Sequence, residues 1–118
     1  MKFIKVWKKS MQYTNKAETF IGFSTRCGKI VFGIEQIERL KRAPKLMILC
    51  STIGENSRKK SLLYAERKNV KVLVLSQRIL GDIVGKDNCK VIGLTDAHLA
   101  QAIIDNSQGW ADSPKVGV

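Results

Sequence analysis

The segment KLMILCSTIGENSRKKSLLYAERKNVKVLVLSQRILGDIVG, residues 45–85, decides the fold. It begins with five consecutive apolar residues, 46–50, a pattern typical of a strand that is buried on both faces. Residues 57–68 then have the spacing of a helix, and residues 72–75 form a second apolar run. Strand, helix and strand in this order predict two parallel strands that are joined by a right-handed crossover.

Parallel strands also predict where a ligand would bind. In open α/β sheets, ligands collect beyond the carboxyl ends of the strands. Here those ends are residues 51–56 and 76–80, which we expect to lie side by side. A binding site is therefore sought first at this edge of the predicted sheet.

The rest of the chain continues the alternation of strands and helices. The predicted elements are a helix at 17–27, a strand at 30–32, a helix at 34–42, a short helix at 77–84, a strand at 89–94 and a helix that begins after Thr95 or Asp96 and reaches about residue 106. This pattern favours an α/β fold, a three-layer α/β/α sandwich with a mixed four-stranded sheet. One domain, 17–106, would lie between a basic N-terminal extension, 1–16, and a tail, 107–118, that docks through Trp110.

The charge of the chain favours a polyanionic partner. The formal net charge is +11 and 44% of the residues are hydrophobic, so a folded basic domain is expected. An excess of this size favours nucleic acid over a membrane surface, although a lysine-rich soluble domain remains the alternative. Residues 1–16 carry lysines and no acid, with aromatic residues interleaved, and form either a nucleic-acid-binding arm or an edge strand. No stretch has the length of a transmembrane helix or the pattern of a secretory signal.

The residues with reactive side chains do not form a catalytic or metal-binding pattern. Cys27, Cys50 and Cys89 are far apart in sequence, and His98 is the single histidine. Zinc therefore lacks ligands, a disulfide framework is not expected, and the two later cysteines resemble small buried apolar residues. The stretch GFSTRCGK, 22–29, differs from a phosphate-binding loop in spacing and in its last residue. We expect a cytoplasmic, monomeric, non-enzymatic protein without a cofactor.

Polar and basic residues, among them Arg26 and Lys29 before the second helix, are expected to gather at one end of the predicted sheet. Arg and Lys would neutralise phosphates, Glu, Gln and Asn would read base edges, and apolar residues would support an unstacked base, which suits structured RNA. The free N–H groups that open the helix after residue 54 could hold a phosphate. The candidate RNA-binding residues are Arg26, Lys29, Gly33, Glu35, Gln36, Arg39, Glu55, Asn56, Arg58, Ser76, Gln77, Arg78, Ile79, Leu80 and Gly81.

Four stretches of this chain resemble a known family. They are RCGKIVFG (26–33), GENSRKK (54–60), SQRILGDIVG (76–85) and VIGLTDAHLAQAII (91–104). They are similar to the L-seven-Ae family of RNA-binding ribosomal proteins, most of all to its small bacterial YlxQ-type members, over about residues 19–106. The resemblance implies an α/β/α sandwich that binds the kink-turn of structured RNA, such as ribosomal RNA.

The sequence departs from that family at one signature. The family reads Gly-x-Asn-Glu-x-x-Lys, whereas this chain has Gly33, then Glu35 and Gln36 in place of the Asn-Glu pair, and Arg39 at the basic position. The family pair recognises the sheared G·A pairs of the kink-turn. Two alternatives to RNA binding follow: a protein-interaction domain of the same fold whose RNA face has decayed, and a small-molecule or nucleotide enzyme on an α/β scaffold.

Overall fold

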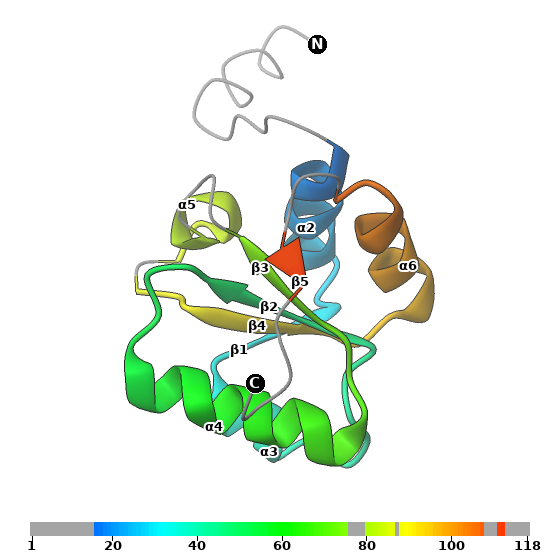
Figure 1. Ribbon diagram of the computed structural model, residues 1–118. Helices are drawn as coiled ribbons and strands as arrows, with labels where there is room; N and C mark the ends of the chain where they lie inside the picture. Colours follow the sequence, from blue (N-terminus) through cyan, green and yellow to red (C-terminus); the bar gives the residue numbers. More distant parts are fainter. Residues whose placement is uncertain (1–15, 76–79, 87, 108–110, 113–118) are drawn as a thin grey trace, which may run out of the picture.

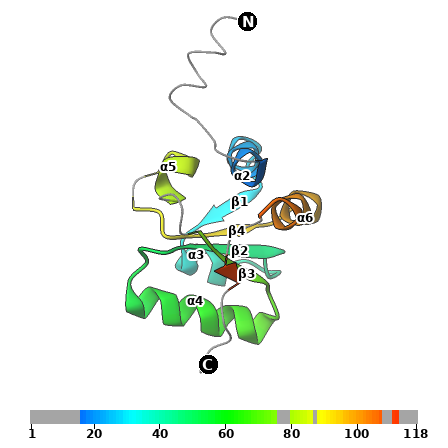
Figure 2. The same ribbon diagram turned by 45° about the horizontal axis from the view of Figure 1, so that its top comes forward.

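A mixed β-sheet separates two layers of helices (Figure 1). The computed structural model describes residues 16–75, 80–86, 88–107 and 111–112. Helices α2, α5 and α6 cover one face of the sheet, and α3 and α4 cover the other, as Figure 2 shows from a second direction. The three-layer α/β/α sandwich expected from the sequence is therefore confirmed.

The sheet has the order β1-β4-β2-β3-β5, and β2 and β3 are parallel, as predicted. Strand β4 lies between β1 and β2 and is antiparallel to both. The elements are α2 (Lys16–Arg26), β1 (Ile30–Phe32), α3 (Ile34–Glu38), β2 (Leu46–Cys50), α4 (Glu55–Lys68), β3 (Val72–Leu75), α5 (Leu80–Val84), β4 (Val91–Leu94), α6 (Ala97–Asp105) and β5 (Ala111–Asp112).

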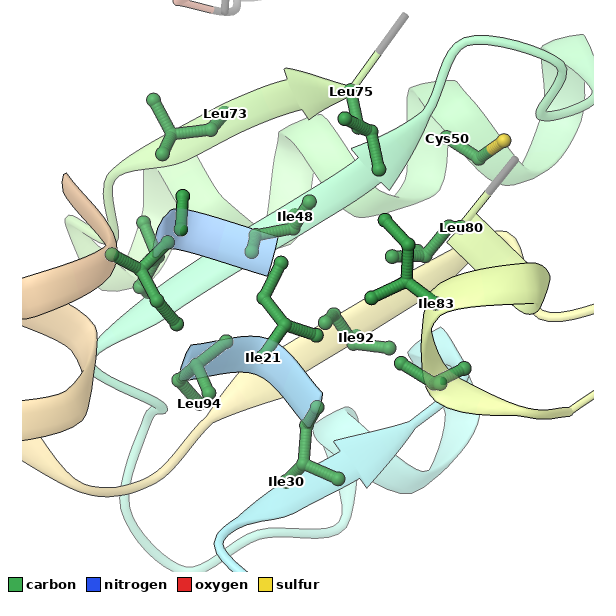
Figure 3. Close-up of a cluster of buried hydrophobic side chains, with 14 of the residues drawn as sticks. Ile21, Ile30, Ile48, Cys50, Leu73, Leu75, Leu80, Ile83, Ile92 and Leu94 are labelled. Atoms are coloured by element: carbon green, nitrogen blue, oxygen red, sulfur yellow. The ribbon is translucent and has the colours of Figure 1, made fainter. Parts of the chain in front are cut away.

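The alternation of side chains along the strands divides the core in two. In β2, Ile48 and Cys50 face α2, α5 and α6, whereas Met47 and Leu49 face α3 and α4. Figure 3 shows the first of these clusters, in which Ile21 of α2 lies over the strands. All five residues of β2 are buried. This explains why its sequence is a continuous apolar run and not an alternating one.

Several boundaries differ from the predicted ones. Helix α4 begins at Glu55, two residues before the expected start, and β4 begins at Val91 and not at residue 89. Helix α3 ends at Glu38, whereas the sequence predicted residue 42. The chain leaves the helix early because it must return to the opposite edge of the sheet to begin β2 at Leu46.

The C-terminal tail contributes a strand that the sequence did not predict. Residues Ala111 and Asp112 pair with Val74 and Leu73 at the free side of β3, which extends the four predicted strands by β5. The proposed docking of Trp110 and the N-terminal extension up to residue 15 lie outside the described residues. The expected cap of the last helix is Asp96, whose carboxylate accepts the Leu99 N–H at 3.0 Å.

Candidate nucleic-acid interface

The carboxyl ends of β1, β2 and β3 meet at one edge of the sheet, here called the carboxyl edge. The Gly33 N–H donates to the Val91 carbonyl at 2.9 Å, which fixes the end of β1 beside the start of β4. The Cys50 N–H donates to the Lys90 backbone carbonyl at 2.8 Å, and the Ser51 N–H donates to the Leu75 carbonyl at 3.0 Å. The segments after β1, β2 and β3 therefore begin next to one another, as the parallel pair predicted.

Two of the candidate residues do not belong to this edge. The opposite end of the same strands, here called the amino edge, is closed by a hydrogen bond of 3.0 Å from the Thr95 N–H to the Lys29 carbonyl. Lys29 immediately precedes β1, and Arg26 ends α2 just before it. The prediction that both lie with Gly33 is wrong, because a strand carries the residues before and after it to opposite edges.

Helix α3 presents Glu35 and Gln36 to solvent at the carboxyl edge. It starts directly after Gly33, whose φ of +87° is a backbone conformation that favours glycine. Ile34 and Ile37 are buried against the sheet, which leaves the side chains of Glu35 and Gln36 exposed. Arg39 caps the other end of the helix, about 7 Å along its axis from the first turn.

Contacts from α4 and β4 hold α3 in place. The Tyr64 hydroxyl donates to the Ile37 carbonyl at 3.4 Å, and Lys60 pairs with Glu38 at 3.6 Å. Burial, and then the charge of Glu38, raises the pKa of Tyr64 above its ordinary value. In β4, a Cβ on Gly93 would lie 3.2 Å from Ile37 Cγ1, so the absence of a side chain there lets α3 pack close to the sheet.

The start of α4 offers free backbone donors at the same edge. Its N-cap is Gly54, and no side chain accepts a hydrogen bond there, so the first N–H groups of the helix have no side-chain cap. Glu55 and Asn56 are exposed and Arg58 is partly exposed in this first turn. A phosphate could bind to these N–H groups, with Arg58 as the nearest cation of the turn.

Helix α5 contributes packing more than contact surface. Leu80 is fully buried in the core, and a Cβ on Gly81 would lie 2.6 Å from the Lys86 carbonyl oxygen. Leu80 is thus a core residue here, and Gly81 is required by the close approach of the following turn. Lys86 in turn lies over the ring of Phe32, 5.2 Å from its centroid, and joins this turn to the end of β1. Ser76, Gln77, Arg78 and Ile79 lie outside the described residues.

Three residues at this edge were not predicted as part of the site. Lys90 Nζ donates to Thr52 Oγ1 at 2.8 Å, and Cys50 Sγ lies 3.1 Å from the same hydroxyl. Burial raises the pKa of the Cys50 thiol, but hydrogen bonds from the backbone of Leu80 and from Thr52, with the charge of Lys90, bring it below its ordinary value. By contrast, burial raises the pKa of Cys89. The antiparallel direction of β4 brings Lys90 here, and the sequence alone did not reveal that direction.

The described part of the carboxyl edge is close to neutral. Glu35, Glu55 and Asp82 lie in the first turns of α3, α4 and α5. The cations nearby are Arg58, Lys86 and Lys90, with Arg39 at the far end of α3. The concentration of positive charge expected here from the sequence is therefore absent from the described residues of this edge.

Comparisons with known proteins place the fold. A solved structure of a protein with unknown function from Bacillus halodurans C has a TM-score of 0.67 with this chain at 27% sequence identity, over 76% of this chain and 94% of that one. No protein-family model matches, and no curated protein matches. The similarity thus extends over most of both chains.

Within residues 16–75, 80–86, 88–107 and 111–112, no three Cys, His, Asp or Glu side chains are grouped so that they could hold a metal ion. No helix in the same ranges has both the length and the apolar character needed to cross a membrane.

Proposed function

We propose that this protein binds structured RNA at the carboxyl edge, without enzymatic activity, as a cytoplasmic component of a ribonucleoprotein such as the ribosome. The observation that carries the proposal is the convergence of Gly33, the first turn of α3 and the uncapped start of α4 at one edge. These segments are more than twenty residues apart in sequence, and they include the last residue of one stretch (26–33) and the start of another (54–60) that resemble the L-seven-Ae family.

The chemistry of this edge suits RNA in a specific way. Exposed Glu35 and Gln36 offer acceptors, and Gln36 also offers donors, to the edges of unstacked bases. The N–H groups at the start of α4 and the guanidinium groups of Arg58 and Arg39 are suited to phosphates. A kink-turn, with its exposed G·A pairs, is the proposed target because of the family resemblance.

A comparison of three RNAs tests the proposal. Gel shifts would measure the affinity of the protein for a kink-turn hairpin, for the same hairpin with its G·A pairs replaced, and for a plain duplex. If the amide reads a base edge, Gln36→Ala should weaken binding of the kink-turn hairpin by about 1–3 kcal/mol and leave binding of the other two RNAs unchanged. Gln101→Ala, on the exposed side of α6, is the matched control. Equal affinity of the wild-type protein for all three RNAs would reject kink-turn recognition.

Arg39 provides a second arm of the same test. Arg39→Ala removes a cation at the end of α3 and should weaken the binding of all three RNAs by the same factor, because a phosphate contact carries no sequence information. Lys59→Ala, which removes a cation from the exposed side of α4, is its control. If neither Gln36→Ala nor Arg39→Ala changes any affinity, the proposed surface is wrong.

The near neutrality of the carboxyl edge favours a second candidate function, protein interaction. Glu35 and Glu55 would repel phosphates, whereas a protein partner can present cations to them. Purification without co-purifying nucleic acid, and no shift of any structured RNA, would support this reading. A high ratio of absorbance at 260 nm to 280 nm in the purified protein would count against it.

A further inference from the structure

Three lysines stand in a row along the amino edge. Lys29, Lys45 and Lys71 each directly precede one of the strands β1, β2 and β3, which run in the same direction. Backbone hydrogen bonds join Lys45 to Leu94 at 2.7 Å and Met47 to Lys71 at 2.9 Å, so the row follows the sheet order. At about 4.8 Å between neighbouring strands, it spans about 14 Å. All three side chains are exposed.

Two flanking segments add four more exposed cations to this row. The loop 39–45 leads into β2 and carries Lys41 and Arg42, and the last turn of α4 carries Arg67 and Lys68. In Figure 1 this turn is the end of α4 from which the chain rises into β3. The amino-edge basic surface comprises Lys29, Lys41, Arg42, Lys45, Arg67, Lys68 and Lys71. Carboxylates adjoin this surface at Glu38, which ends α3 and pairs with Lys60, at Glu66 in α4, and at Asp96, which caps α6.

Local structure explains only part of this concentration. Arg67 and Lys68 complement the negative end of the α4 dipole. Lys45 directly precedes a strand and has no such role, and repulsion among the seven cations costs stability in the folded state. A surface of this kind is matched by a dense polyanion.

The absence of apolar neighbours favours nucleic acid over a lipid surface. Membrane-binding surfaces combine cations with exposed Trp, Phe or Leu. Among the residues that the structure describes, the large exposed hydrophobic side chains are Phe23 and Leu63, and neither belongs to the amino-edge basic surface. A phosphodiester backbone, which offers a continuous row of charges, fits the row of lysines better.

We infer that the amino-edge basic surface binds the phosphate backbone of a helical arm of the same RNA that the carboxyl edge holds. This inference rests on the proposed function. Strand β2 separates the two edges, and its five residues span about 17 Å. An RNA with a short stem therefore reaches one edge only, and an RNA with a longer arm contacts both.

The test compares two hairpins that share one kink and differ in stem length. Fluorescence anisotropy over a range of salt concentrations would use the full chain and the variant Lys41→Gln/Lys45→Gln. The wild-type protein should bind the long-arm RNA more tightly. If each lysine neutralises one phosphate, the variant should bind the long-arm RNA up to about 60-fold more weakly at 0.1 M salt. The slope of log K against log salt concentration should then be shallower by about 2. Short-stem binding should not change.

A control variant and four outcomes decide the result. Lys59→Gln/Lys60→Gln removes the same charge from the exposed side of α4, outside the amino-edge basic surface, and should keep the advantage of the long arm. The inference would be overturned if both double variants lost the same affinity for the long-arm RNA, or if the wild-type protein bound both hairpins equally. In either case, binding of the short-stem hairpin would leave the proposed function intact. If the wild-type protein bound neither hairpin, both the inference and the proposed function would be overturned. Binding to phosphatidylserine vesicles through Lys41 and Lys45, without a long-arm advantage, would assign the surface to membranes and overturn the inference.

Discussion

A methyl group at position 93 would test how closely α3 is held against the sheet. Gly93 lies in β4 opposite Val31 and Met47. A Cβ there would be 3.2 Å from Ile37 Cγ1, 3.2 Å from Pro44 Cβ and 3.3 Å from Ile37 Cδ1. Ile37 is fully buried and Pro44 is a buried, rigid ring, so neither side chain has room to withdraw.

The expected cost follows from two opposing effects. Overpacking of a core in this way costs about 1–3 kcal/mol. Replacing a glycine inside a strand returns about 0.5–1 kcal/mol, because the unfolded chain loses conformational freedom. Gly93→Ala should therefore lower the free energy of unfolding by about 1.3 kcal/mol, the difference between the midpoints of these two ranges, which urea denaturation at constant m-value would measure.

A second substitution identifies the mechanism. Ile37→Val removes Cδ1, one of the crowded atoms, and alone should cost about 0.5–1.5 kcal/mol. Gly93→Ala/Ile37→Val should be less destabilised than the sum of the single variants by at least about 0.5 kcal/mol. Strict additivity of the two costs, or a neutral Gly93→Ala, would refute the argument that the glycine exists to admit α3.

Three further perturbations address other elements. Gly81→Ala should destabilise by about 1–3 kcal/mol in urea denaturation despite the better helix propensity of alanine, because its Cβ would meet the Lys86 carbonyl oxygen at 2.6 Å; an unchanged midpoint would contradict this reading. Gly54→Asp should raise stability by about 0.5–1 kcal/mol, because its carboxylate can cap α4 in open space, and should weaken RNA binding at the same N–H groups; tighter RNA binding would exclude a phosphate there. Asp96→Ala should lower the melting temperature at pH 7. The hydrogen bond from the Leu99 N–H lowers the pKa of Asp96, so the stability that this carboxylate adds is present above the ordinary carboxyl pKa and is lost as the pH falls through the lower pKa of the folded state. A difference in melting temperature between wild type and Asp96→Ala that persists unchanged in acid would contradict this.

Elements that are buried on both faces were the most predictable from sequence. The bounds of β2 and β3 agree with the predicted ones residue for residue, because continuous apolar runs end where the chain leaves the core. The end of α3 was not predictable in this way, since it depends on the path that returns the chain to the start of β2. The strand β5 was missed because its two residues have no periodicity.

The candidate site was predictable where strand direction alone decides position. Gly33, Glu35, Gln36, Glu55 and Asn56 lie at the carboxyl edge, as the order of the elements required. Arg26 and Lys29 were grouped with them because they are close in sequence, although β1 separates the two groups. Lys90 and Thr52 were missed because their contact depends on the insertion of an antiparallel β4 between β1 and β2.

The lengths of the outermost strands have a consequence for behaviour at high concentration. Within the residues that the structure describes, the sheet ends in β1, with three residues, and in β5, with two, and its most apolar strand, β2, lies between two neighbouring strands. Short borders offer few unpaired N–H and C=O groups to a second sheet, which limits edge-to-edge association. Because β5 covers part of β3, removal of residues 108–118 would expose Leu73 and Val74 along a longer border. A truncated chain would then be more prone to aggregation even where the fold itself survives.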